Sequence, residues 1–185
     1  MPTFGRAGGS LENPDFLSNA ETAQAGRAGE LATAAILEKL SRERGFAVLH
    51  DLRIPNAKAN IDHIVVAGDQ VTIIDSKMWK PGFYWTLGGK TRRGFEPVPH
   101  ADKRGIPLAH TRITEMLDGL NLAPRMQRPL MVIHPSRRDG KLSIWAFRPT
   151  SDPGTVVRAV HPAQLRFPAK PGNARIVAAL TRLVI

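Results

Sequence analysis

Residues 61–79, IDHIVVAGDQVTIIDSKMW, contain the pattern that decides the fold. Two runs of branched aliphatic residues flank Gly68-Asp69, a two-residue turn signal, so the stretch predicts a β-hairpin. If these two residues form the loop, counting outward along both strands places Asp62 opposite Asp75. Side chains alternate between the two faces of a strand, so both aspartates share a face with Lys77.

Two carboxylates opposite each other destabilise a sheet unless something neutralises them, such as a shared proton, a nearby cation or a divalent ion. Oxygen ligands suit Mg²⁺, Mn²⁺ or Ca²⁺, and the Ser76 carbonyl would add a third protein oxygen to those of Asp62 and Asp75. A metal ion with Lys77 beside it would suit hydrolysis of a phosphodiester bond. The simpler alternative is that Lys77 only neutralises the two acids.

A helix is expected before the hairpin. Ser18 and Glu21 have the spacing of a capping box, small and apolar residues then follow a 3.6-residue period, and Gly45 ends the pattern. Glycines on the core face would allow a close approach to another element. Glu30 lies at the edge of the face that contains Leu37, so its carboxylate could reach the hairpin acids. The alternative is an ordinary first-turn glutamate that the helix dipole stabilises.

The remaining segments alternate between strand and helix patterns. Their order predicts an α/β domain built on one mixed central sheet that helices flank. Residues 1–17 are aperiodic and predict a flexible N-terminal arm, so residues 18–185 would form a single domain. The predicted elements are strands over 46–54, 61–66, 71–77, 130–134 and 142–147, a hairpin turn at Gly88-Gly89, and helices over 107–120 and 174–184, the last capped by Asn173.

The sequence also predicts the surroundings of one histidine and of one short basic segment. His63 alternates with Asp62 along its strand, so it falls on the opposite face and is expected to be a hydrogen-bonded core histidine. Residues 136–138, Ser-Arg-Arg, follow the strand over 130–134 and are expected to form an exposed hairpin tip that could contact a DNA backbone.

Composition excludes several classes of protein. The chain has no cysteine, which excludes disulfides, thiolate metal sites and cysteine nucleophiles and fits a reducing cytosol. No apolar run approaches the roughly 18–20 residues that span a bilayer, and the N-terminal residues lack the pattern of a signal peptide. The sequence therefore predicts a cytoplasmic protein without a membrane partner.

The formal net charge is +10, and the excess is concentrated in two segments. Residues 77–112 contain eight Lys and Arg against two acids, and residues 125–148 contain six against one. Such clusters are typical of proteins that bind DNA, although a solvated basic surface is the alternative. Residues 83–85, Phe-Tyr-Trp, could stack on bases, but at least one of these rings is expected in the core. The candidate nucleic-acid contacts are Lys80, Tyr84, Trp85, Lys90, Arg92, Arg93, Lys103, Arg104 and Arg112.

Three runs in order along the chain resemble one family. GRAGE (26–30), LRIPNAKANIDHIVV (52–66) and VTIIDSKMW (71–79) are similar to the nuclease-related domain, NERD, of the PD-(D/E)xK nuclease superfamily. The resemblance covers about residues 26–120 and implies a restriction-endonuclease-like core. It also implies a metal-dependent DNA nuclease, most simply an endonuclease, that uses Mg²⁺ or Mn²⁺ and acts on DNA.

In this resemblance, Asp62 and Asp75 would be metal ligands, Lys77 the catalytic lysine, and Glu30 the helix acid that completes the site. Asp75 stands where the family more often has Glu. The family usually has Gln in the next helix, whereas residues 101–120 contain none, and the candidates to replace it are His110 and Arg112.

Three other functions stay open. They are a DNA-binding module without activity, a structure-specific nuclease of the Holliday-junction-resolvase type, and an interaction scaffold that uses the acidic N-terminal arm. Nucleases of the superfamily often work as dimers, so a homodimer is compatible with the resemblance.

Overall fold

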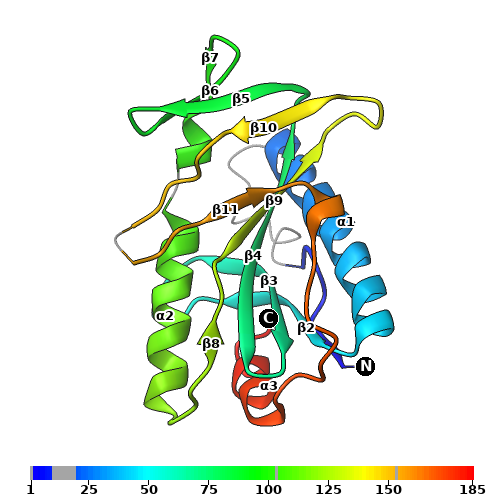
Figure 1. Ribbon diagram of the computed structural model, residues 1–185, viewed down its shortest axis with the longest axis vertical. Helices are drawn as coiled ribbons and strands as arrows, with labels where there is room; N and C mark the ends of the chain where they lie inside the picture. The colour runs from blue at the N-terminus through cyan, green and yellow to red at the C-terminus, as the bar shows by residue number, and fades with distance from the viewer. Residues whose placement is uncertain (1, 10–19, 103, 153) are drawn as a thin grey trace.

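The computed structural model describes residues 2–9, 20–102, 104–152 and 154–185 of an α/β protein (Figure 1). Its helices are α1 (Ala20–Arg44), α2 (Gly105–Gly119) and α3 (Ala174–Thr181). Its strands are β1 (Thr3–Phe4), β2 (Ala47–Arg53), β3 (Asn60–Ala67), β4 (Gln70–Trp79), β5 (Gly82–Leu87), β6 (Lys90–Arg93), β7 (Glu96–Pro97), β8 (Arg125–Met126), β9 (Leu130–Pro135), β10 (Leu142–Ala146) and β11 (Arg158–Val160).

The strands form two sheets. The large sheet has the order β1-β2-β3-β4-β9-β11, with β8 beside β4, and the small sheet has the order β10-β5-β6-β7. The large sheet is mixed, because β2, β3 and β4 are antiparallel neighbours whereas β9 is parallel to both β4 and β11. This mixed sheet with flanking helices agrees with the predicted α/β class and is compatible with a restriction-endonuclease-like core.

The register of the β3–β4 hairpin confirms the turn at Gly68-Asp69. Ala67 pairs with Gln70, and the pairing continues without a shift to His63 and Ile74. Gly68 has a φ of 61°, the left-handed conformation that such turns require and that glycine adopts without strain. Asp62 and Asp75 occupy the next positions of this register, at the end of the ladder.

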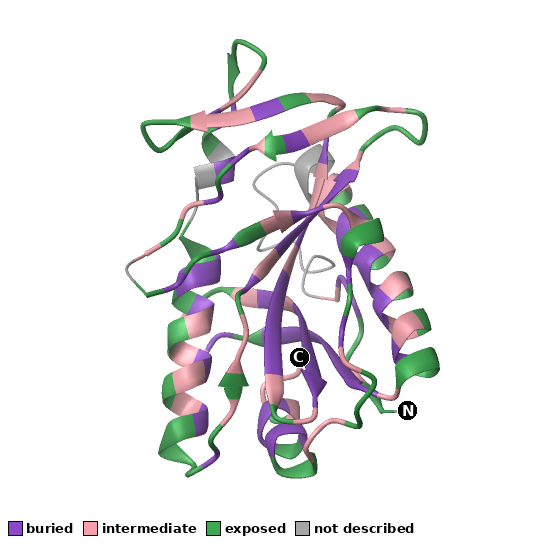
Figure 2. Ribbon diagram, viewed as in Figure 1, coloured by how far each residue is buried: buried purple, intermediate pink, exposed green. Residues whose placement is uncertain are grey.

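Each face of the large sheet packs against different helices. On one face, Leu37 of α1 contacts a cluster that includes Val65 and Ile74. On the other face, Ile113 of α2 and Leu180 of α3 contact a cluster that includes Ile64, Ile73 and their neighbours. Figure 2 shows that the central strands are buried along most of their length, whereas the small sheet is largely half-buried or exposed. The hairpin is therefore held rigidly between two helical layers.

The structure differs from the expected single sheet. Strand β9 already has β4 on one edge and β11 on the other, so it has no free edge for β10. Strand β10 instead pairs in parallel with β5, and the predicted hairpin over 130–147 does not form. Residues 136–138 therefore belong to a connection between two sheets.

Near the N-terminus the structure differs from the sequence prediction, whereas near the C-terminus it agrees with it. Thr3–Phe4 pair with β2 as a regular strand inside the segment for which we expect an arm, while the mobility of that arm stays a prediction. The expected capping residue Ser18 lies outside the described residues. Asn173 caps α3 as predicted, since its side chain accepts from the N–H groups of Arg175 and Ile176. No helix in the described ranges is long and apolar enough to cross a membrane.

Candidate active site

Asp62, Asp75 and Lys77 meet where the β3–β4 hairpin leaves the ladder. Lys77 Nζ lies 2.6 Å from Asp75 Oδ2 in an ion pair and donates to the Ser76 carbonyl at 3.4 Å. The backbone N–H of Ser76 donates to Asp62 Oδ2 at 2.6 Å, which ties the β3 aspartate to β4. The turn count from the sequence therefore places these three side chains correctly relative to one another.

The charges in this cluster shift one another's pKa values. Burial raises the pKa of Asp62 well above its ordinary value, and the negative charges of Asp75 and Glu30 raise it further. Burial lowers the pKa of Lys77, but the three acids together outweigh burial, so the pKa lies above its ordinary value. Lys77 is consequently a protonated ammonium at neutral pH, which can stabilise negative charge and cannot act as a base.

Glu30 reaches the cluster from α1, with 9% of its surface exposed. Burial and then the charge of Asp51 raise its pKa to about 7, while Lys77 and the N–H of Gly8 act in the opposite direction. The preceding residue explains how the helix comes so close. A Cβ atom at Gly29 would lie 3.3 Å from the backbone of Lys77 and Met78, so glycine is what allows this contact.

Asp51 is an acid of this region that the sequence analysis missed. It lies on β2 between the pairs His50–His63 and Leu52–Ile61, which places it in register with Asp62. It is 2% exposed, has a φ of 50°, and accepts from Asn60 Nδ2 at 3.5 Å. Three neighbouring strands thus each contribute an aspartate at one level of the sheet. An acid inside the apolar run FAVLHDLRI was the available signal.

A chain of buried hydrogen bonds lies on the sheet face opposite Asp75 and Lys77. His50 Nδ1 and His63 Nδ1 are 2.8 Å apart, and His63 Nε2 lies 3.1 Å from Ser76 Oγ. Ser76 Oγ donates to Thr33 Oγ1 at 2.9 Å, and Thr33 Oγ1 lies 2.8 Å from His134 Nε2. Burial lowers the pKa of all three histidines. His63 is therefore the hydrogen-bonded core histidine that the alternation predicts.

The donor chemistry of the cluster fits a hard divalent cation. Asp75 Oδ2 is buried, and its close neighbour among the described residues is the Lys77 ammonium at 2.6 Å. Asp62, Asp75 and the Ser76 carbonyl would hold Mg²⁺ or Mn²⁺, because Mg²⁺ commonly uses one or two carboxylates and keeps several waters. Within the described ranges, no three His, Cys, Asp or Glu side chains are arranged to hold a metal ion together.

Helix α2 presents small and apolar residues to the acids. A cavity of about 50 Å³ beside Asp62 and Asp75 is lined by Gly105, Ile106 and Ala109 of this helix, among others. The two candidates for the missing glutamine have other contacts. His110 Nδ1 lies 3.4 Å from Thr155 Oγ1, and Arg112 donates to Glu115.

The predicted nucleic-acid contacts have different surroundings. Tyr84, predicted as a nucleic-acid contact, is instead buried: it stacks on Trp79 with ring centroids 4.6 Å apart and donates to the Lys80 carbonyl. It is the ring of the three aromatics that enters the core. Lys103 lies outside the described residues. Lys80 and Lys90 are exposed, whereas Trp85, Arg92, Arg93, Arg104 and Arg112 each bond or pair with a neighbour.

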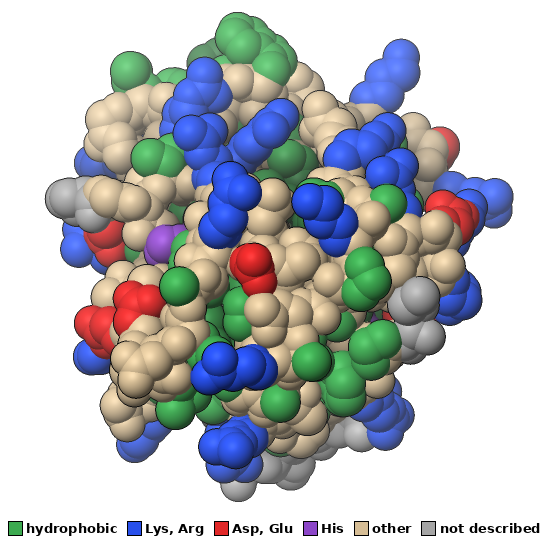
Figure 3. Space-filling model, turned by 60° about the horizontal axis from the view of Figure 1, so that its bottom comes forward, with side chains coloured by type: hydrophobic (Ala, Val, Ile, Leu, Met, Phe, Trp, Pro, Cys, Tyr) green, Lys and Arg blue, Asp and Glu red, His purple; other side chains and the backbone are tan. Residues whose placement is uncertain are grey.

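The basic side chains are not confined to one patch. Figure 3 shows one face of the molecule, on which Lys and Arg side chains are spread widely and Asp and Glu side chains are scattered between them. A polyanion would consequently meet positive charge over much of this face.

The fold and the cluster define a class of protein. A mixed sheet flanked by helices, with two acids and a lysine on its central hairpin, is compatible with a restriction-endonuclease-like core. The family model of the nuclease-related domain, NERD, matches residues 25–113, a span that contains Glu30, Asp62, Asp75 and Lys77. This segment belongs to the nuclease-related domain family, which confirms the resemblance. No curated protein and no solved structure matches the chain significantly.

Proposed function

We propose that this protein is a divalent-metal-dependent deoxyribonuclease that hydrolyses phosphodiester bonds within DNA, and is thus an endonuclease. The observation that supports the proposal is the meeting of Asp62, Asp75, Glu30 and Lys77 at one end of a rigid hairpin inside a nuclease-related segment. Four charged groups are not gathered in this way for stability, because burying like charges together is costly.

Each side chain has a role that its surroundings support. A divalent ion would supply positive charge that neutralises the phosphate and makes water more acidic. Lys77, held protonated by the acids, would position the attacking water or stabilise charge that develops on the phosphate oxygens. Glu30, with its pKa of about 7, can take up a proton near neutral pH. The Ser76 N–H holds Asp62 in place.

Incubation of the purified protein with supercoiled plasmid and Mg²⁺ or Mn²⁺ tests the proposal. We expect nicked or linear products, and no cleavage in EDTA. Asp75→Asn and Lys77→Met preserve side-chain size but remove charge, so each should reduce the rate by about 100-fold or more. Asp118→Asn and Lys39→Met, which change exposed residues outside the cluster, are the matched controls. Undiminished cleavage by the Asp75→Asn protein would exclude this site.

One observation favours a second candidate, a DNA-binding module without activity. The Lys77 ammonium lies against Asp75 Oδ2 and the Ser76 carbonyl, the oxygens that a metal ion would use, so the lysine could simply neutralise the acids. DNA binding without cleavage in Mg²⁺, Mn²⁺ and Ca²⁺ would support this candidate. Within the enzyme class, faster cleavage of a four-way junction than of linear duplex would indicate a resolvase.

A further inference from the structure

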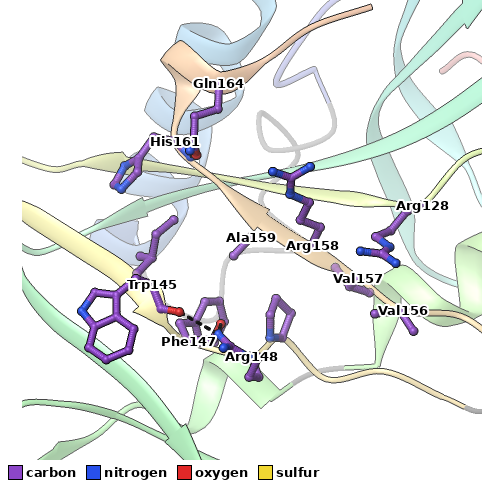
Figure 4. Close-up of a pocket in the computed structure, with 12 residues that line it drawn as sticks. Arg128, Trp145, Phe147, Arg148, Val156, Val157, Arg158, Ala159, His161 and Gln164 are labelled. Atoms are coloured by element: carbon purple, nitrogen blue, oxygen red, sulfur yellow. Dashed lines mark hydrogen bonds between the residues drawn. The ribbon is translucent and has the colours of Figure 1, made fainter.

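A second surface with ligand-binding character lies between the free edges of the two sheets. Strand β11 ends the large sheet and β10 ends the small one, and a cavity of about 460 Å³ lies beside them. Its arginines come from three places in the fold, as Figure 4 shows: Arg128 precedes β9, Arg148 follows β10, and Arg158 begins β11. Most of this surface lies after residue 113, beyond the segment that the family model matches.

The charge of this pocket is positive and uncompensated. All three arginines are exposed, and none of them has a carboxylate partner within the part of the chain that the structure describes. The described residues that line it include no acid, and His161 adds another polar group. One guanidinium is held in place, because Arg148 donates to the carbonyls of Trp145 and Phe147 at 2.7 and 3.0 Å. Guanidinium groups arranged in this way favour phosphate groups.

Trp145 lines this pocket, and a second exposed aromatic ring, that of Phe83, lies beside it. Trp145 of β10 is 74% exposed and Phe83 of β5 is 41% exposed, and their ring centroids are 5.8 Å apart. Ile144 and Tyr84, which precede and follow these residues in their strands, are buried, so both rings lie on the outer face of the small sheet. Large exposed aromatic side chains on a sheet can serve as platforms on which nucleic-acid bases stack.

The same outer face also carries positive charge farther along the sheet. The β5–β6 register places Arg92 opposite Trp85 and Lys90 opposite Leu87. Glu96 is the one acidic residue in the four described strands of this sheet, and it is paired with Arg93. Aromatic platforms among uncompensated basic residues match a ligand that has both flat bases and phosphates.

We propose that Phe83, Trp145 and the pocket of Arg128, Arg148 and Arg158 bind an unpaired nucleic-acid strand. Its bases stack on the two rings and its phosphates contact the arginines. An unpaired strand is required, because the bases of a duplex are stacked on one another and expose no face to a protein ring. An acidic protein would also match the arginines, but it has no flat bases for the exposed rings of Phe83 and Trp145, so the two features together favour a nucleic acid.

The position of this surface deepens the proposed function, on which this part of the inference rests. Asp75 pairs with Met131 of β9, and Met131 pairs with Ala159 of β11, which lines the pocket. The pocket is therefore two strand spacings from the acid cluster, or roughly 10 Å. A single DNA molecule could reach both, so the favoured substrate is duplex DNA with an adjoining single-stranded segment.

Fluorescence anisotropy in EDTA tests binding without cleavage. The probe is a fluorescein-labelled oligothymidylate of about 12 nucleotides, with a blunt-ended duplex DNA of about the same length for comparison. We expect Trp145→Ala and Phe83→Ala each to weaken oligothymidylate binding by about tenfold while the blunt-ended duplex is bound almost as before. Arg148→Ala and Arg158→Ala should reduce the slope of log affinity against log salt by about 0.7 for each phosphate that the variant no longer neutralises.

Controls and outcomes separate this inference from the nuclease proposal. Phe95→Ala removes a 93% exposed aromatic outside the platform, and Arg166→Ala removes an exposed arginine outside the pocket, so neither should change binding. Circular-dichroism melting checks folding, which the exposed positions should leave intact. Weaker binding by the platform variants supports the inference even if plasmid is never cleaved. Unchanged oligothymidylate binding by a folded Phe83→Ala/Trp145→Ala double variant overturns it and assigns the face to a partner of another kind, such as a protein.

Discussion

Glu30 shows how a single buried acid can report on the whole cluster. Its pKa of about 7 lies above its ordinary 4.5, because burial and neighbouring acids disfavour the charged form. The neutral Glu30 carboxyl makes its full contribution to the free energy of unfolding below about pH 4.5. This contribution is lost as the pH rises through about 7. Glutamine, which is neutral and of the same size, avoids this loss.

We therefore predict that Glu30→Gln raises the free energy of unfolding in EDTA at pH 8, by on the order of 1–3 kcal/mol, and changes it little at pH 4.5. Thermal melts should show a Tm increase of roughly 2–4 °C per kcal/mol for a chain of this length. Glu43→Gln, an exposed glutamate of the same helix, is the control and should show no pH-dependent difference. A wild-type protein at least as stable as Glu30→Gln at pH 8 would contradict the assignment.

Individual residues differ in how far the sequence could place them. Asp62, Asp75 and Lys77 followed from one turn and the alternation of side chains, which are local rules. Asp51 did not, because its proximity depends on the β2–β3 register, for which residues 54–60 contain no comparable two-residue turn. Tyr84 could be recognised as one of three competing aromatics, but which ring enters the core depends on packing against Trp79.

The close contact between α1 and β4 depends on the absence of a Cβ atom at Gly29. A methyl group at Gly29 would press against the backbone of Lys77 and Met78, and β4 is fixed by β3 and β9 on its two sides. Alanine normally stabilises a helix by up to about 1 kcal/mol relative to glycine, but overpacking typically costs about 1–3 kcal/mol.

We predict that Gly29→Ala lowers the Tm and reduces cleavage by displacing Glu30, and that Gly29→Val does so more strongly. Gly119→Ala in α2 is the matched control. A Cβ atom there meets nothing within 4 Å, so this variant should gain roughly 0.5–1 kcal/mol. Denaturant unfolding and initial cleavage rates measure the two effects. Equal stabilisation by both substitutions would mean that α1 can move away from the strand without cost.

At the level of elements, the sequence predicts whether a segment is a helix or a strand better than it predicts which strands pair. The helices and the longer strands have apolar periods that extend over several turns or pairs, so their positions were predictable within a few residues. Strands β1, β7, β8 and β11 have two or three residues each, too few to show any period. The place of β10 depended on whether β9 had a free edge, which only the complete sheet decides.

For the whole molecule, the net charge of +10 predicts DNA binding that weakens steeply with salt. The slope of log affinity against log salt should be about −0.9 for each duplex phosphate neutralised. We expect a Lys80→Ala/Lys90→Ala/Arg92→Ala protein to have a shallower slope than the wild type in filter-binding titrations from about 50 to 200 mM salt.

A second triple variant provides the control for total charge. Lys39→Ala/Arg175→Ala/Arg182→Ala removes the same charge from exposed positions on α1 and around α3. If the two triple variants have the same slope, binding reflects overall charge, and the assigned basic residues contribute nothing specific.

The buried hydrogen bonds beneath the hairpin have a direction as well as a length. Ser76 Oγ donates to Thr33 Oγ1, so it accepts from His63 Nε2–H, and His63 Nδ1 is left to accept from His50 Nδ1–H. Thr33 then donates to His134 Nε2. The protons of these four hydrogen bonds therefore all point the same way along the chain. The hydrogen-bond chain from His50 to His134 consequently has a net dipole. The direction of this dipole can reverse only if the protons of all four hydrogen bonds shift together.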